Sequence, residues 1–246
     1  YKGVLKNWDP IIRSLDVRRK IEDRILTDLV LEDKFQKENE AFIFLLKGFA
    51  GSGKTVLLKR LAWECSLEFE KCCIYVKPET SLRSKPILEL FTYVKERIYI
   101  FIDNLLANEK QLIELIKKAE REQIPISIVT TERINQLNDE ESIEGYVSKD
   151  YKLNYLLDTE VEILISKLEK HDSLGHLKNK TKEQRKRELA EKTGRVLLVA
   201  LYEATGGRPF EDIIYDEYSS LNSDELKAIY LTVAVFHRLN TKVRTY

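Results

Sequence analysis

The chain has 246 residues, 43% of them hydrophobic and 33% charged, which is enough for one large domain or two small ones with buried cores. Its 41 Lys and Arg residues balance its 41 Asp and Glu residues, so no net charge draws the whole molecule to nucleic acid or to a membrane surface. Its longest apolar runs are much shorter than the ~18 residues that a membrane helix needs.

The cysteines and the chain ends indicate the cellular compartment of the protein and whether it is part of a longer polypeptide. No apolar core with a cleavage site opens the sequence, so no signal peptide is expected. Cys65, Cys72 and Cys73 fit neither a paired disulfide framework nor a zinc spacing, and we interpret them as core thiols in a reducing cytoplasm. The sequence contains no methionine and stops without a tail, which favours a fragment of a longer polypeptide.

Residues 1–40 predict an extended segment followed by a helix. Apolar residues recur at helical spacing from Val17 to Leu29. Asp16 is the predicted N-cap of this helix, because a short acidic side chain accepts hydrogen bonds from the first free backbone N–H groups.

Residues 41–150 predict an α/β core. Short apolar runs rich in β-branched and aromatic residues lie at residues 41–48, 71–78, 97–104 and 124–133. Helical stretches separate them, at residues 54–65, 86–95 and 109–121. Strand and helix alternating at this spacing predict βαβ units, and therefore a parallel sheet covered by helices on both faces.

Strands nearly vanish after residue 150. Residues 151–156 could form a last strand, and Thr159 with Glu162 predicts a capping box that opens the next helix. Further helices are expected, one of them closed by Gly206 and Gly207, and Ser223 is expected to cap the final one. We therefore predict a helical domain over residues 151–222 and a further element over 223–246.

Residues 48–55, Gly-Phe-Ala-Gly-Ser-Gly-Lys-Thr, match the pattern of a phosphate-binding loop. Its glycines permit positive φ and let backbone N–H groups surround phosphate oxygens, while the following helix directs its positive end at the same anion. Lys54 supplies a mobile charge to the β- and γ-phosphates, and the Thr55 hydroxyl ligates Mg²⁺. The predicted contacts to ATP or ADP in this stretch are Gly48, Gly51, Ser52, Gly53, Lys54, Thr55 and Val56.

A second element of the predicted site follows the apolar run at residues 97–102. Asp103 there places a carboxylate at the carboxyl end of a strand, facing the metal of the loop; a turn or helix-cap residue is the alternative. Asn104 comes next, where many P-loop ATPases have a glutamate that activates water. An amide can orient water but cannot accept its proton. A base could come from elsewhere in the chain, and Glu132 is one candidate. Because residue 104 is an amide, the sequence predicts slow hydrolysis.

The run at residues 124–133 supplies a third element. If this strand lies next to the P-loop strand, its polar end stands beside the γ-phosphate, where Thr131 or Arg133 could sense that charge. The alternative for Arg133 is a surface residue paired with a neighbour. A fourth stretch, Gly207-Arg208-Pro209, is by itself only a loop in which Pro209 fits the first position of a helix.

In this order the elements resemble the STAND class of signal-transducing P-loop NTPases. The segments LKGFAGSGKTVLLKRLAWE and TGGRPFEDIIYDEY are similar to a bacterial subgroup found in anti-phage proteins. The resemblance implies a P-loop NTPase sheet over residues 41–150, an α-helical lid domain over 151–222 and the start of a winged-helix domain over 223–246. It also implies that Gly207 and Pro209 form a lid motif near the adenine, and that Arg18 or Arg19 lies near the base.

The resemblance further implies a function. ATP with Mg²⁺ would bias a closed-to-open equilibrium, and the open form would self-associate and activate an effector domain on the same polypeptide, after a sensor domain meets a phage-derived trigger. One alternative is a DNA-binding or DNA-remodelling ATPase of the origin-binding type, although the balanced charge shows no basic surface for DNA. A small-molecule kinase is a third class, and the STAND-like lid argues against it.

Overall fold

The computed structural model describes residues 8–37, 39–77, 80–134, 143–192, 214–215 and 218–238. The chain divides into two compact units, Tyr1–Leu164 and Ile165–Tyr246, and each is described by itself. Within the described ranges, no helix combines the length and the hydropathy that crossing a membrane requires.

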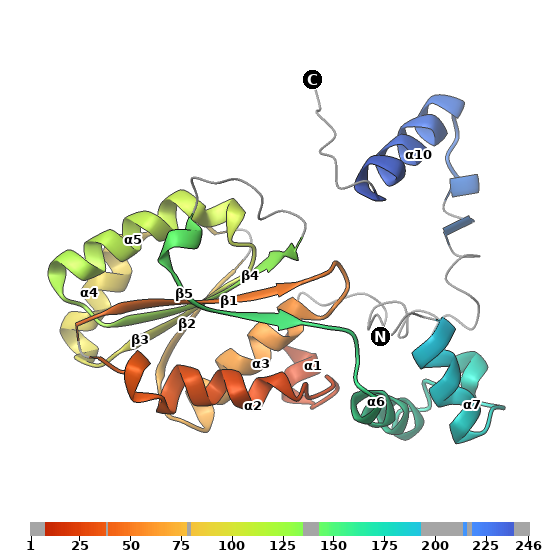
Figure 1. Cartoon of the computed structure of the whole chain (residues 1–246), viewed down its shortest axis with the longest axis horizontal. Helices are drawn as coiled ribbons and strands as arrows, with labels where there is room; N and C mark the ends of the chain where they lie inside the picture. The colour runs from red at the N-terminus through yellow and green to blue at the C-terminus, as the bar shows by residue number, and fades with distance from the viewer. Residues whose placement is uncertain are drawn as a thin grey trace. The chain divides into compact units, whose positions relative to one another are not determined.

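The first unit is built on a five-stranded parallel sheet (Figure 1). Its strands are β1 (Ala41–Gly48), β2 (Cys72–Val76), β3 (Ile98–Ile102), β4 (Ile126–Arg133) and β5 (Val147–Leu153). They lie in the order β2-β3-β4-β1-β5, so β4 pairs directly with the strand that leads into the P-loop. This sheet confirms the predicted α/β P-loop NTPase fold, and the last strand begins and ends earlier than residues 151–156.

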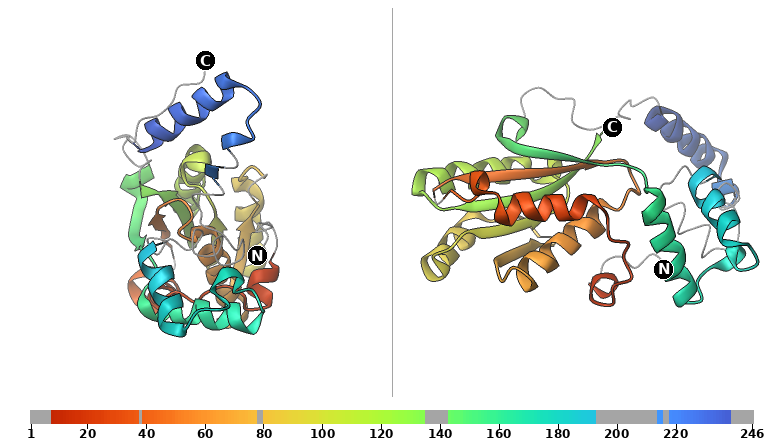
Figure 2. Two further views of the ribbon diagram at one scale, coloured as in Figure 1. Left: turned by 90° about the vertical axis from the view of Figure 1, so that its right-hand side faces the viewer. Right: turned by 60° about the horizontal axis from the view of Figure 1, so that its bottom comes forward.

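Helices cover both faces of the sheet (Figure 1). One face carries α2 (Ile21–Leu26), its π-helical continuation η1 (Thr27–Leu31) and α3 (Lys54–Leu67), while α1 (Asp9–Ile12) packs on α3. Figure 2 shows α2 and α3 side by side on this face. The other face carries α4 (Ser84–Val94) and α5 (Glu109–Glu122). Short 3₁₀ turns lie at η2 (Asp33–Phe35), η3 (Leu106–Asn108) and η5 (Ile143–Tyr146).

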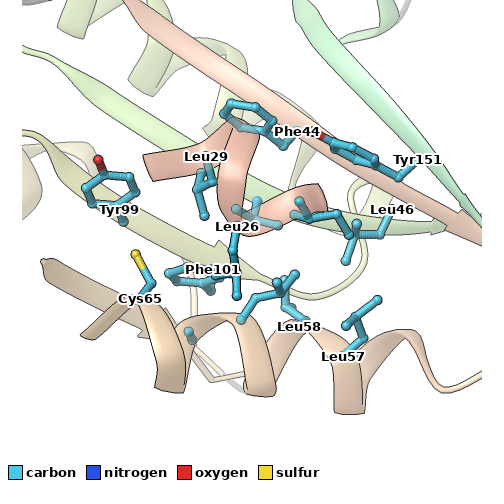
Figure 3. Packing of buried hydrophobic residues seen from close by; sticks show 14 of the residues in the cluster. Leu26, Leu29, Phe44, Leu46, Leu57, Leu58, Cys65, Tyr99, Phe101 and Tyr151 are labelled. Atoms are coloured by element: carbon cyan, nitrogen blue, oxygen red, sulfur yellow. The ribbon is translucent and has the colours of Figure 1, made fainter. Parts of the chain in front are cut away.

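Side-chain alternation along the strands divides the core into two layers. Phe42, Phe44 and Leu46 of β1 join the cluster under α2 and α3, while Ile43 and Leu45 join the cluster under α4 and α5. Figure 3 shows the first layer, in which side chains of α2, η1 and α3 meet large side chains of the sheet: Leu26, Leu29, Leu57, Leu58, Cys65, Phe44, Leu46, Tyr99, Phe101 and Tyr151.

The segment before α2 departs from the prediction. The helix begins at Ile21 rather than near Val17, and its N-cap has no side-chain hydrogen bond, so the predicted cap at Asp16 is wrong. Asp16 instead pairs with the buried Arg60 guanidinium of α3, with Arg60 Nε 2.9 Å from its Oδ2. A buried guanidinium that lacks a carboxylate is costly, and this need outweighs a helix cap on the surface.

Helix α6 (Asp158–Lys170) starts in the first unit and crosses the boundary at Leu164. The predicted capping box of Thr159 and Glu162 is wrong, because the helix begins one residue earlier. Glu160 fills the third helical position, and its Oε2 accepts the Leu157 N–H at 2.9 Å. Asp158 thus lies in the first helical turn, where a negative charge favours the positive end of the helix.

The described part of the second unit contains helical elements of different lengths. They are η6 (Gly175–Leu177), α7 (Lys182–Arg187), the π-helical η7 (Glu188–Lys192) and α10 (Asp224–Arg238). A capping box of Thr181 and Gln184 opens α7. The Ser223 hydroxyl accepts the Leu226 N–H at 3.1 Å, which confirms the predicted cap of the last helix. The predicted helix end at Gly206 and Gly207 lies outside the described residues.

A pair of buried carboxylates joins α2 to α3. Glu22 is 1% exposed and faces Glu64. Arg18 donates from Nε to Glu22 Oε1 at 3.0 Å and from Nη2 to Glu64 Oε2 at 2.9 Å. Arg60 also lies near, with its Nη1 3.9 Å from Glu64 Oε1, but its guanidinium is paired with Asp16. Burial and then the Glu64 charge raise the pKa of Glu22 to about 7 in spite of these cations.

This raised pKa predicts a pH dependence of stability. The unfolded chain loses the Glu22 proton near pH 4.5, whereas the folded chain holds it until about pH 7, so this contribution to stability falls as the pH rises through that interval. Glu22→Gln has the shape of the protonated side chain but cannot titrate. Between pH 5 and pH 8 we expect its free energy of unfolding to fall by about 1–3 kcal/mol less than that of wild type. Urea unfolding at both pH values measures this, with the exposed Glu89→Gln as control. Equal pH slopes for wild type and Glu22→Gln would contradict the assignment.

Candidate nucleotide-binding site

The loop between β1 and α3 has the shape that a phosphate requires. Gly51 and Gly53 have φ values of 74° and 93°, a region that other residues rarely adopt. A Cβ at Gly48 would lie 2.7 Å from Ser52 Oγ and 3.2 Å from the Leu153 carbonyl oxygen, so any side chain there would collide with the loop. The loop leads directly into the 14-residue helix α3, whose positive end favours an anion.

Lys54 lies across this loop. Its Nζ donates to the carbonyl oxygens of Gly48 at 2.8 Å and Phe49 at 2.9 Å. Burial and then the neighbouring positive charge of Arg133 lower the pKa of Lys54. Ser52 Oγ is buried and has no hydrogen-bond partner among the described residues. Two nearby cations and a free buried hydroxyl fit a polyphosphate, because an anion would relieve both the repulsion and the unmet hydrogen bond.

Asp103 reaches the same place from β3. Tyr99 and Phe101 point to the α3 side of the sheet, and two-residue periodicity brings Asp103 to that side as well. Its Oδ2 accepts the Thr55 hydroxyl at 2.6 Å, and its Oδ1 accepts the Thr131 hydroxyl. A hydroxyl and a carboxylate are hard oxygen donors of the kind that Mg²⁺ prefers, and this metal usually takes few protein ligands and keeps its phosphate and water ligands. The side chains present therefore fit a nucleotide-bound Mg²⁺.

The two residues considered as water-activating groups are both engaged elsewhere. Asn104 has a φ of 63°, and its Oδ1 accepts the Ala107 N–H at 3.2 Å, so its side chain closes the turn at η3. Glu132 is 3% exposed, and its two oxygens accept the N–H groups of Leu106 at 2.9 Å and Arg133 at 2.7 Å. Glu132 thus orders the loop after β3, and neither side chain stands as a free proton acceptor.

The end of β4 lies beside the P-loop. The hypothesis that Thr131 or Arg133 senses the γ-phosphate depends on this position. Arg133 pairs in register with Gly48, and its exposed side chain lies close enough to Lys54 to lower the pKa of that lysine. Thr131 is buried and bonds Asp103, while its hydroxyl also accepts the Asn104 N–H at 3.1 Å. Both residues of the sensing hypothesis therefore lie at the site.

The structure separates the two adjacent arginines that precede α2. Arg18 is largely exposed and pairs with Glu22 of α2 and Glu64 of α3. Arg19 is 7% exposed and donates from Nη1 to the Ser52 carbonyl oxygen in the P-loop at 3.1 Å. The other residues predicted for the site lie in different parts of the chain. Val56 follows Thr55 in the first turn of α3, whereas Gly207 and Pro209 lie outside the described residues.

Two further residues at the site have no signal in the sequence. Tyr155, just after β5, stacks on Phe49 of the P-loop with ring centroids 5.8 Å apart and an angle of 10° between the rings. Glu160 forms an ion pair with Arg19. A glutamate near a helix start is usually a surface residue, so its burial could be recognised only once the fold had brought the two segments together.

A structure of the E. coli MS115-1 HORMA:CdnC:Trip13 complex contains a similar chain, with a TM-score of 0.55, 12% identity, and coverage of 98% of this chain and 95% of that one. The structure of Rhizobiales Trip13 is similar with a TM-score of 0.53 and 15% identity, over 100% of this chain and 97% of that one. At these identities the likeness concerns the fold alone.

The sequence itself matches no curated protein. The family model described as Novel STAND NTPase 5 matches residues 1–142. These residues hold the P-loop, Asp103 and the end of β4, and they make up more than half of the chain. The chain therefore belongs to the Novel STAND NTPase 5 family.

Proposed function

We propose that this chain binds ATP or ADP with Mg²⁺ and serves as the nucleotide-dependent switch of a larger protein. The contact between the Thr55 hydroxyl and the Asp103 carboxylate carries the proposal, because it joins the P-loop to the third strand where a metal would lie. Backbone N–H groups of Gly51 to Gly53, together with Lys54, bind phosphate, and Thr55 and Asp103 hold the metal. Bound Mg²⁺ would neutralise phosphate charge.

The first test concerns nucleotide binding. Lys54→Ala removes a charge-assisted contact to phosphate, and we expect ATP and ADP affinities to fall by about 10- to 100-fold. Asp103→Asn should weaken binding in the presence of Mg²⁺ and much less in its absence. Isothermal titration calorimetry measures both, with Lys85→Ala on the exposed face of α4 as a matched control. Unchanged affinity in Lys54→Ala would overturn the proposed site.

Arg133 is proposed to sense the γ-phosphate. Its exposed side chain at the edge of the P-loop and its proximity to Lys54 support this role, since a guanidinium there would favour the nucleotide with the greater negative charge. Thr131, bonded to Asp103, would transmit the state of the metal site to β4.

Arg133→Ala should therefore change discrimination between nucleotides more than overall binding. We expect ATP affinity to fall about 10-fold while ADP affinity stays within about twofold. Competition titrations with both nucleotides on the same protein preparation give this ratio directly. Equal weakening of ATP and ADP would assign Arg133 to general phosphate binding instead.

Slow hydrolysis is also proposed. Asn104 cannot accept a proton, and both oxygens of Glu132 are held by backbone N–H groups, so the described residues offer no ready base beside the γ-phosphate position. A long-lived nucleotide suits a switch, because the bound state then persists long enough for assembly.

In the full-length protein we expect ATP turnover below about one per minute, well under typical enzymes, together with a nucleotide-dependent rise in molecular mass that Lys54→Ala abolishes. Phosphate release and mass photometry on matched samples measure the two quantities. Fast turnover by a persistent monomer would argue for a working ATPase rather than a switch.

The wider role is proposed from the family resemblance. Residues 151–222 would form a helical lid in which Pro209 lies near the adenine, and residues 223–246 would begin a winged-helix domain. Self-association would activate an effector domain on the same polypeptide, in bacterial antiviral defence. Phage plating on cells that express the full-length protein or its Lys54→Ala form tests this role, and equal plating would contradict it.

A further inference from the structure

Arg19 connects three separate segments of the first unit. Its guanidinium, 7% exposed, donates from Nη1 to the Ser52 carbonyl oxygen at 3.1 Å and from Nη2 to the Asn154 carbonyl oxygen at 2.7 Å. A longer contact from Nη2 reaches the Tyr155 carbonyl oxygen at 3.4 Å. The segment before α2, the P-loop and the connection after β5 thus meet on one side chain.

Glu160 holds this side chain in place. Its carboxylate is 2% exposed, and its Oε2 lies 3.1 Å from Arg19 Nε, close enough for an ion pair. Its Oε1 accepts the Lys20 N–H at 2.9 Å, and its Oε2 accepts the Leu157 N–H at 2.9 Å. A guanidinium held by a fixed carboxylate loses little further freedom when it donates elsewhere, so Glu160 determines where Arg19 points.

The contact of Arg19 to Ser52 has a direct consequence for phosphate binding. The C=O and N–H of one trans peptide unit point in opposite directions. Holding the Ser52 carbonyl toward Arg19 therefore turns the Gly53 N–H away from Arg19. Gly53, with its φ of 93°, can rotate this peptide more freely than other residues, so without the clamp the loop would sample several orientations.

A second buried ion pair in the same unit also fastens the N-terminal segment. Asp16 and Arg60 tie the chain before α2 to the middle of α3, and Arg60 also donates to the Ile11 carbonyl oxygen at 3.1 Å. Neither contact touches the P-loop. Arg19 and Glu160 are comparable in burial to that pair, but here Nη1 of Arg19 donates to the loop itself.

We propose that Glu160, acting through Arg19, is a positioning residue that sets the Ser52–Gly53 peptide for phosphate binding and couples nucleotide occupancy to the start of α6. The proposal rests on the nucleotide-binding function proposed above. Because coupling between two sites is reciprocal, a bound phosphate that fixes this peptide also fixes Arg19, and with it the first turn of α6. This helix continues across the boundary into the second unit.

The test uses three variants of the chain. Glu160→Gln removes the charge that orients Arg19. Arg19→Lys keeps the positive charge but cannot reach the Ser52 carbonyl and Glu160 together, and it serves alone if Glu160→Gln does not fold. Asp16→Asn is the matched control, since it breaks a buried ion pair of the same unit that does not touch the P-loop.

Two measurements are made on each folded variant. ADP affinity by calorimetry should fall about 10-fold in Glu160→Gln and in Arg19→Lys, and the double variant should lose no more than either single one, because both act on one contact. Asp16→Asn should lower the unfolding temperature without changing ADP affinity. Amide exchange at Leu157 should slow on ADP addition in wild type and stay unchanged in Arg19→Lys, a response that a merely structural role would not produce.

The outcomes separate this proposal from the function on which it rests. If wild type binds ADP and Lys54→Ala does not, while Glu160→Gln and Arg19→Lys bind ADP as wild type does, the positioning role is overturned and the nucleotide site stands. An exchange rate at Leu157 that does not respond to ADP in wild type overturns the coupling to α6. If wild type and Lys54→Ala do not differ, the nucleotide site itself is overturned.

Discussion

The meeting of the Thr55 hydroxyl and the Asp103 carboxylate depends on the parallel order and register of the central strands. The carboxyl ends of β3, β4 and β1 lie at one edge, and the two-residue alternation turns Asp103 and Thr131 toward the helix that follows the P-loop. A slip of one residue along β3 would send Asp103 to the opposite face, under α5. The apolar runs that fill both layers of the core fix that register, so packing far from the loop determines its chemistry.

The two edges of the sheet differ in how fully their polar groups are paired. At the amino edge, Arg97 is 8% exposed, and its guanidinium donates to four acceptors from two segments: the carbonyl oxygens of Lys37 and Glu40 before β1, and the Ile126 carbonyl oxygen and Ser127 hydroxyl of β4. Toward the carboxyl edge, the described residues leave the buried hydroxyls of Ser52, Tyr75 and Thr130 without hydrogen-bond partners. Buried polar atoms are rarely left unpaired, and the unpaired Ser52 hydroxyl lies in the phosphate-binding loop, where a ligand is expected. The hydrogen bonds of Arg97 stabilise the fold at the amino edge, whereas the Ser52 hydroxyl at the carboxyl edge stays available to a ligand.

Local patterns sufficed for the strands β1 to β4, the helices α3 to α5 and the P-loop, because each depends on a run of neighbouring residues. β1 has the predicted bounds, and the neighbouring placement of β4 follows the expectation for a polar strand end beside the P-loop. The caps at Asp16 and Thr159 were wrong because partners distant in sequence decided them: Arg60 draws Asp16 away, and Glu160 serves the start of α6. Arg18 and Arg19 could not be told apart by spacing, since only the tertiary fold shows which of two adjacent side chains points inward. What each site residue does in binding and hydrolysis stays a prediction.

The aromatic packing around Trp8 provides an intrinsic fluorescence probe. Trp8 and Trp63 are the two tryptophans of the sequence, their ring centroids lie 6.4 Å apart, and Trp8 also meets Tyr75 edge-on at 5.1 Å. Trp63 lies on α3, the helix that begins at the P-loop, and the sequence after Leu164 contains no tryptophan. Tryptophan fluorescence, excited selectively over tyrosine, therefore arises from one region beside the phosphate-binding helix, and no dye is needed to follow it. A change in tryptophan emission when nucleotide is mixed with the protein would time events at α3 free of any signal from the second unit.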